Sequence, residues 1–135
     1  MGTQTKRIVR DRANNRCEYC RPPQKLASFV TFHIEHIQAT QHVEDDSLEN
    51  LALACPDCNR YKGPNLTTLD PVTRQLVLLF HPREDRWRDH FHYSGGLLVG
   101  DTTVGEATIR LLQINSDQRV GYRNELLDSD TGAFA

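Results

Sequence analysis

The segment that decides the fold is residues 32–63, which read FHIEHIQATQHVEDDSLENLALACPDCNRYKG. It opens within an apolar and β-branched run, residues 29–34, whose composition favours a β-strand. The run leads directly into Glu35 and His36, two side chains suited to metal and proton chemistry. Because adjacent strand residues face opposite sides, the two can serve one site only at the end of the strand or on a bulge.

The second half of the segment predicts a return strand followed by a helix. Residues 51–54 are apolar and are expected to pair with residues 32–37. Residues 57–62 have the composition of a helix start, and Gly63 followed by Pro64 stops it. The segment therefore predicts the order strand, loop, strand, helix.

The four cysteines of the chain fall into two pairs of identical spacing, Cys17 with Cys20 and Cys55 with Cys58. In a reducing compartment, paired Cys-x-x-Cys elements are more typical of a tetrahedral zinc site than of disulfides. A two-residue gap lets a tight turn aim both thiolates at one ion, and two such turns complete four-coordination. Because four thiolates leave no open position, we predict a structural zinc ion.

Composition and hydropathy are those of a globular protein of about one domain, with 38% hydrophobic and 25% charged residues. The longest apolar run, residues 76–80, is far shorter than the roughly 20 residues needed to span a bilayer. Residues 1–12 are polar and basic and do not resemble a signal peptide. We therefore expect a cytoplasmic protein with no membrane partner.

The charge distribution is uneven although the net charge is only -2. Residues 1–25 contain seven Lys and Arg against two acidic side chains, whereas residues 65–135 contain seven against ten. Phosphate backbones are bound mainly by Lys and Arg, so a basic N-terminal face beside the site is one interpretation. An ordinary solvated helix face is the other, and charge alone does not separate the two.

Phosphodiester hydrolysis needs a base for the attacking water and a cation that stabilises charge on the reacting phosphate. His36 carries the side-chain type that exchanges protons near neutral pH. Glu35 and Asn59 offer hard oxygen ligands of the kind that Mg²⁺ or Mn²⁺ prefers. Asn50 has an amide able to bridge backbone groups across the loop. The candidate nucleic-acid contacts are three basic side chains: Arg60, Lys62 and Arg16.

Residues 33–37 (HIEHI) and 49–63 (ENLALACPDCNRYKG) together resemble the signature of HNH endonucleases with the ββα-metal fold, in their zinc-bearing bacterial form. The resemblance covers about residues 10–64. It implies that His36 is the general base and that Asn50 orients the His36 loop. It also implies two sets of metal ligands: Glu35 and Asn59 for a catalytic divalent ion, and Cys17, Cys20, Cys55 and Cys58 for structural zinc.

Two positions depart from the family pattern. Glu35 stands where Asp is more frequent, so the reach of the ligand changes by one methylene group. Asn59 stands where the name-giving pattern has His, as in the HNH domain of RNA-guided CRISPR nucleases. An amide oxygen is a harder ligand than imidazole, which favours Mg²⁺ or Mn²⁺ over softer metals.

Several polar residues near the motif have a purely structural interpretation. His33 is expected to pack or form hydrogen bonds, and His42 receives no role. Residues 44–46 are consecutive acids that are best explained as a solvated loop. Residues 81–92 are basic and aromatic but interrupted by acids, which favours sheet packing and salt bridges over DNA contact.

The flanking segments predict further elements. A basic helix is expected over residues 3–13 with Thr3 as its cap, and a last helix from Ser116 to Leu127. Thr103 and Glu106 have capping-box spacing at the start of another helix. A small antiparallel sheet is expected to bury five apolar residues, Leu76, Leu78, Phe80, Phe91 and Leu98.

These observations predict an α+β fold: a zinc-stabilised ββα-metal (HNH) core over residues 1–64 and, packed on it, a C-terminal small antiparallel sheet with two helices over residues 65–135. The predicted function is metal-dependent hydrolysis of nucleic acid, with DNA preferred. A non-catalytic zinc-stabilised module that binds nucleic acid or protein is the alternative. A domain of this size makes few base contacts, so we expect low specificity or a targeting partner; the sequence does not predict the oligomeric state.

Overall fold

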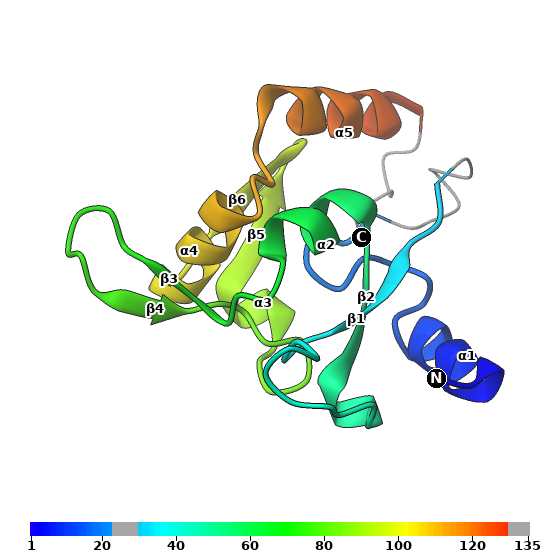
Figure 1. The fold of residues 1–135 in the computed structure, drawn as a ribbon. Helices are drawn as coiled ribbons and strands as arrows, with labels where there is room; N and C mark the ends of the chain where they lie inside the picture. Colours follow the sequence, from blue (N-terminus) through cyan, green and yellow to red (C-terminus); the bar gives the residue numbers. More distant parts are fainter. Residues whose placement is uncertain (23–29, 130–135) are drawn as a thin grey trace.

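The computed structural model describes residues 1–22 and 30–129 (Figure 1). In chain order its elements are α1 (Thr3–Arg12), β1 (His33–His36), the 3₁₀ turn η2 (Leu48–Asn50), β2 (Leu51–Ala54), α2 (Pro56–Lys62), β3 (Thr67–Leu69), β4 (Leu76–Leu78), α3 (Trp87–His90), β5 (Phe91–Ser94), β6 (Leu97–Gly100), α4 (Thr103–Leu111) and α5 (Asp117–Ser129). The predicted α+β class and the order strand, loop, strand, helix are confirmed.

The β1–β2 hairpin and α2 form the centre of the N-terminal half. β1 pairs with β2 antiparallel and without a bulge, so that Glu35 lies opposite Ala52 and His36 opposite Leu51. His36 is the last residue of β1, which is the first of the two placements expected for the Glu35-His36 pair. The strand starts later than expected, and residues 23–29 lie outside the described part of the chain.

The helix α2 begins where the sequence predicts because its first turn is built by a cysteine and a proline. Cys55 is the N-cap, and its sulfur accepts a hydrogen bond from the backbone N–H of Cys58. Pro56 occupies the first turn, where its missing N–H costs nothing. Gly63 ends the helix at φ +51°, in the left-handed region that favours glycine.

The helix α1 packs along the β1–β2 hairpin. Arg10 donates a hydrogen bond to the carbonyl of Phe32 over 3.2 Å, and Arg12 donates to the carbonyl of Leu51. The N-cap is Gly2 and no side chain caps the helix, so the expected capping role of Thr3 is wrong. The helix ends before Asn14, whose φ of +55° turns the chain toward Cys17.

The C-terminal half contains two separate hairpins, β3–β4 and β5–β6, where one sheet was expected. Phe80, Phe91 and Leu98 are buried as predicted. The predicted burial of Leu76 and Leu78 is wrong, because their side chains are 71% and 66% exposed. The period of two along β4 turns Val77 toward the molecule, and Figure 1 shows the loop that joins β3 and β4 projecting at one side of the fold.

The last two long helices begin close to the predicted positions. Thr102 caps α4 through a hydrogen bond from the N–H of Gly105, one residue before the cap expected from the spacing. Ser116 accepts a hydrogen bond from the N–H of Arg119, in agreement with its predicted capping role. α5 lies across one end of the molecule, beside α2 and the β5–β6 hairpin (Figure 1).

A single hydrophobic cluster contains residues from both halves of the chain. Val9, Phe32 and Leu53 from the first half share it with Phe91 and Leu112 from the second. Within the described ranges, no helix has both the length and the apolar character needed to cross a membrane. The division at residue 64 stays a prediction.

Candidate active site and four-cysteine centre

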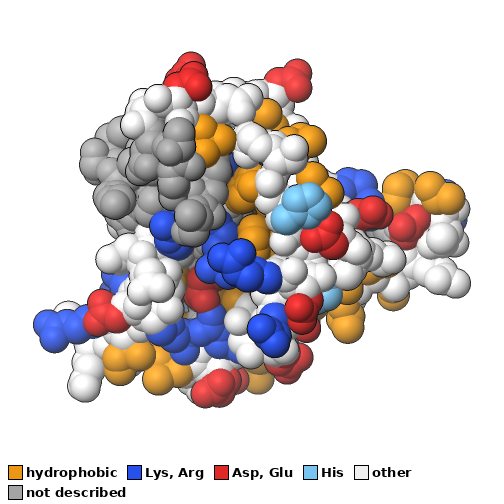
Figure 2. Space-filling model, turned by 180° about the vertical axis from the view of Figure 1, so that it is seen from behind, with side chains coloured by type: hydrophobic (Ala, Val, Ile, Leu, Met, Phe, Trp, Pro, Cys, Tyr) orange, Lys and Arg blue, Asp and Glu red, His pale blue; other side chains and the backbone are white. Residues whose placement is uncertain are grey.

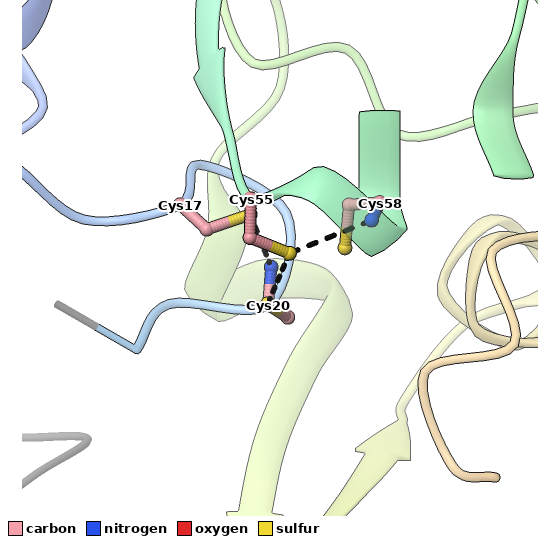
Figure 3. Close-up of side chains that lie close together, drawn as sticks. All are labelled: Cys17, Cys20, Cys55 and Cys58. Carbon is pink, nitrogen blue, oxygen red and sulfur yellow. Dashed lines mark hydrogen bonds between the residues drawn. The ribbon is translucent and has the colours of Figure 1, made fainter. Parts of the chain in front are cut away.

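Four cysteine sulfurs from two distant segments converge (Figure 3). Cys17 and Cys20 lie on the loop after α1, and Cys55 and Cys58 lie at the junction of β2 and α2. All four sulfur atoms are within 4.8 Å of one another. The N–H of Cys20 donates to Cys17 Sγ over 3.5 Å, and the N–H of Cys58 donates to Cys55 Sγ over 3.4 Å. Each pair thus forms the tight turn that the spacing predicts.

The geometry of the four thiols fits a zinc ion. A tetrahedral site with Zn–S bonds of about 2.3 Å places its sulfurs about 3.8 Å apart. The sulfurs of Cys20 and Cys55 are separated by 3.7 Å. Burial, together with the neighbouring thiols, raises the pKa of Cys58 well above its ordinary value. The thiolate form is therefore unfavourable here unless a cation compensates its charge. A bound zinc ion would supply that charge, so the donor set suits the structural zinc ion predicted from the sequence.

Hydrogen bonds attach the first cysteine pair to the rest of the fold. Glu18 joins it to β2, donating its N–H to the carbonyl of Leu53 and accepting the N–H of Leu53 on its carboxylate, both over 2.8 Å. The indole N–H of Trp87 donates to the carbonyl of Tyr19 over 2.8 Å, and the hydroxyl of Tyr93 donates to the carbonyl of Cys20. Residues beyond position 64 therefore help to hold the four-cysteine centre in place.

Arg119 is a neighbour of the cysteines that the sequence does not reveal. From α5 it donates to Cys58 Sγ over 3.1 Å and to Cys55 Sγ over 3.7 Å, while its other terminal nitrogen donates to the carbonyl of Leu112 over 2.9 Å. Burial alone would lower the pKa of Arg119, but the thiolates of Cys58, Cys20 and Cys55 raise it above its ordinary value. A guanidinium here offsets part of the negative charge of the thiolates.

Glu35 lies inside the molecule, on the side of β1 that faces α2. Its carboxylate accepts a hydrogen bond from the hydroxyl of Tyr19 and lies 3.6 Å from the ammonium of Lys62. Burial raises its pKa to about 7, although the charge of Lys62 and the hydrogen bond from Tyr19 act in the opposite direction. The carboxylate can therefore exchange a proton close to neutral pH.

Asn59 is half-buried on α2, three residues before Lys62. Residues three apart on a helix share a face, so Asn59 lies on the face of α2 whose Lys62 contacts Glu35. Helix α2 thus packs against β1, the strand that carries Glu35.

His36 lies at the end of β1 and is held by an acidic side chain from the following loop. Its Nε2 is 2.6 Å from Oδ1 of Asp46. The side chain of His36 is 23% exposed and that of Asp46 62% exposed, so the imidazole is open to water on one side. The sequence shows Asp46 only as one of three consecutive acids, and nothing in that pattern singles it out as the partner of His36.

Asn50 closes the loop between β1 and η2. Its Oδ1 accepts the N–H of Gln38 over 2.8 Å, and its Nδ2 donates to the carbonyls of Gln38 over 3.1 Å and of Asp45 over 2.8 Å. Asp45 is the neighbour of Asp46, so the buried amide fixes the backbone beside the partner of His36. Bridging of backbone groups is the contact pattern expected of this side chain.

The three candidate nucleic-acid contacts lie in different surroundings. Lys62 is 1% exposed and donates to the carbonyl of Ile37 over 2.9 Å, so its position does not suit contact with phosphate. Arg60 is exposed, with its guanidinium over the ring of Tyr61 at 4.6 Å. Arg16 is half-buried and donates to the carbonyl of Arg21 over 3.2 Å.

Comparison with known proteins supports the resemblance seen in the sequence. The family model of the HNH endonuclease matches residues 17–65, a range that contains all four cysteines and the Glu35-His36 pair. Searches of curated proteins and of solved structures give no significant match. Residues 17–65 of this chain are therefore similar to the HNH endonuclease family, and the four clustered cysteines are consistent with its zinc-binding type.

Proposed function

We propose that this protein is a metal-dependent endonuclease that hydrolyses phosphodiester bonds of nucleic acid, with DNA as the preferred substrate. The observation that carries the proposal is the end of β1, where Glu35 faces α2 and the next residue, His36, is held by Asp46 and remains open to water. A buried carboxylate beside a supported, accessible imidazole is the pairing that metal-assisted hydrolysis uses.

His36 is the proposed general base. An Asp46 carboxylate at Nε2 favours the tautomer in which Nε2 carries the proton, which leaves the lone pair of Nδ1 free to accept a proton from water. The charge that develops on the imidazole is then stabilised by Asp46. Asn50 keeps this arrangement in place through the backbone of Gln38 and Asp45.

Glu35 and Asn59 are the proposed ligands of a catalytic Mg²⁺ or Mn²⁺ ion. Both offer oxygen atoms, and they lie on facing elements that meet at the contact between Glu35 and Lys62. Such an ion, when bound, stabilises negative charge on the phosphate and on the leaving 3′ oxygen. Tyr19 holds the Glu35 carboxylate in position by its hydrogen bond, and Lys62 offsets its charge. Zinc binding requires the four cysteines to be reduced, and this condition is met in the cytoplasmic location predicted from the sequence.

A second candidate function, a zinc-stabilised binding module without cleavage, is favoured by one observation. Glu35 already has two protein partners, Tyr19 and Lys62, and the position that is His in the name-giving pattern holds Asn59. A carboxylate so engaged can serve as a structural group in the core. Cleavage must therefore be measured directly.

The deciding experiment is cleavage of supercoiled plasmid by purified protein with no added divalent ion, with Mg²⁺ and with Mn²⁺. Wild type is expected to nick the plasmid only when the ion is added, and His36→Ala is expected to lose this activity. His33→Ala is the matched control, because His33 is exposed on the same strand two residues away. Equal nicking by wild type and His36→Ala, or no nicking under any ion, would overturn the nuclease proposal.

A further inference from the structure

We propose that Arg16, Arg21 and Arg88 form one surface, here called the arginine surface, that binds the phosphate backbone of DNA. The inference rests on the proposed function and names where the substrate is held. The three residues come from the loop after α1, the end of the first cysteine pair and α3, so only the fold brings them together.

Arg21 is the centre of the arginine surface and is fixed by its neighbours. Its guanidinium lies over the ring of Trp87, 4.8 Å from the centroid. Trp87 is itself held by its hydrogen bond to the carbonyl of Tyr19. Arg16 donates to the carbonyl of Arg21, and Arg88, which is exposed, follows Trp87 on α3. The Arg21 side chain is therefore oriented before any ligand arrives.

The positive charges of the arginine surface repel one another. The charges of Arg88 and Arg16 both lie close enough to act on the half-buried Arg21. The acids lining the adjacent hollow have other partners: Glu18 accepts a hydrogen bond from Arg83, and Asp85 accepts the backbone N–H of His81 over 2.9 Å. A phosphate relieves this repulsion, and guanidinium groups match phosphate geometry.

The arginine surface continues toward His36 through Arg12. A polar hollow of about 140 Å³ is lined by Arg12, Arg16 and Arg21 together with Trp87. Arg12 donates to the carbonyl of Leu51, the residue paired with His36 in the β1–β2 register. A DNA phosphate backbone held on the arginine surface can thus extend to the end of β1, which carries the proposed base His36.

Figure 2 shows Lys and Arg side chains gathered near the centre of one side of the molecule, with acidic side chains among and around them. This local concentration accounts for phosphate binding by a chain whose net charge is -2. Contacts of this kind position nucleic acid without reading its sequence. The arginine surface therefore predicts salt-sensitive binding of low sequence preference.

Binding is tested by fluorescence anisotropy of a labelled DNA duplex with the His36→Ala protein and no added divalent ion, over a series of salt concentrations. The test variant adds Arg16→Gln and Arg88→Gln, which leaves the stacked Arg21 in place. The matched control adds Arg74→Gln and Arg110→Gln, two exposed arginines elsewhere on the fold, so both variants lose the same charge. Zinc content and melting temperature show that each variant is folded.

The test variant is expected to bind at least tenfold more weakly, with a log–log salt slope reduced by about 0.9 for each phosphate that the protein no longer neutralises. The DNA affinity of the control is expected to stay within about twofold of the parent, because Arg74 and Arg110 lie outside the arginine surface. Equal losses in both variants, an unchanged slope, or no binding by the parent would overturn the proposal. A parent that binds while wild type fails to cleave would instead remove the nuclease proposal and leave this one standing.

Discussion

Arg119 donates a hydrogen bond to the sulfur of Cys58 over 3.1 Å, although 61 residues separate the two in sequence. The contact joins α5, which lies outside the matched domain, to the four-cysteine centre. Partners of metal ligands orient those ligands and adjust their charge, and removing them typically weakens metal binding by 10- to 100-fold. We therefore expect zinc binding to be coupled to the docking of α5.

Replacement of Arg119 by Ala is expected to weaken zinc binding by roughly tenfold, because a cation that stabilises the thiolates is lost. Arg119→Lys is expected to recover part of the affinity, since the positive charge remains but the paired N–H donors do not. The measurement is zinc transfer to a chromogenic chelator at increasing chelator concentration.

Arg110→Ala serves as the control for Arg119→Ala, because Arg110 is an exposed arginine on α4. Its zinc affinity is expected to match that of wild type. If Arg119→Ala lost zinc at the same chelator concentration as this control, the hydrogen bonds to Cys55 and Cys58 would have no energetic role.

Removal of the zinc ion is expected to unfold the N-terminal half of the chain. Folding free energy is supplied directly by structural zinc sites, and here the four cysteines join the loop after α1 to the β2–α2 junction. Circular dichroism during titration with a strong chelator should show loss of helix signal, and added zinc should restore it. Elemental analysis should find one zinc ion per chain. A chain that stayed folded without metal would contradict the assignment.

The sequence predicts the ββα order and the four-cysteine centre because both depend on spacing within short segments. Two residues between cysteines build a turn, and Gly63 marks where α2 ends whatever surrounds it. The orientation of β4 is different, because a strand of three residues can turn either face inward. Only packing of the hairpin against α4 decides that Val77, and not Leu76, is turned inward.

The partners of the candidate active site lie beyond the reach of sequence patterns. Tyr19 meets Glu35 only because the first cysteine pair folds against β2, and Arg119 meets Cys58 only because α5 docks beside α2. Asp46 is one of three adjacent acids, and the turn fixed by Asn50 selects which of them reaches His36. Such contacts are properties of the tertiary fold.

Asn50→Ala is expected to destabilise the protein by about 2 to 3 kcal/mol, because the three hydrogen bonds of a buried amide to the backbone of Gln38 and Asp45 are lost together. The expected loss of cleavage exceeds the loss of stability, since the loop that carries Asp46 is released. Urea unfolding and plasmid nicking measure the two effects. Asn50→Asp is the informative comparison, because it keeps the acceptor for Gln38 and loses both donors. Unchanged stability in both variants would contradict the bridging role.

Glu35 is expected to make stability depend on pH when no divalent ion is added. Its pKa is raised by burial from 4.5 to about 7 in the folded protein, so between these values the folded chain holds a proton that the unfolded chain has lost. The stabilising effect of this proton is complete below pH 4.5 and is lost as the pH rises to 7. The change amounts to roughly 3 kcal/mol at about 1.4 kcal/mol for each pKa unit.

The pH effect is measured as the free energy of unfolding in urea at several pH values for wild type and Glu35→Gln. The neutral amide cannot titrate, so the variant is expected to lose the decline in stability that wild type shows toward pH 7. Proton release from other groups, including the cysteines, is common to both proteins and cancels in the comparison. Parallel pH curves would show that folding does not shift the pKa of Glu35 and would contradict the prediction.

Asp46→Asn is expected to lower the rate of metal-dependent cleavage by about tenfold while zinc content and stability stay at wild-type levels. The carboxylate, 62% exposed, contributes little to folding, but it sets the tautomer of His36 and stabilises the imidazolium formed during the reaction. The neighbouring exposed acid Glu44 supplies the control, because Glu44→Gln removes the same charge without touching the imidazole. Equal rates for the two variants would mean that charge in the loop, and not the contact with Nε2, supports His36.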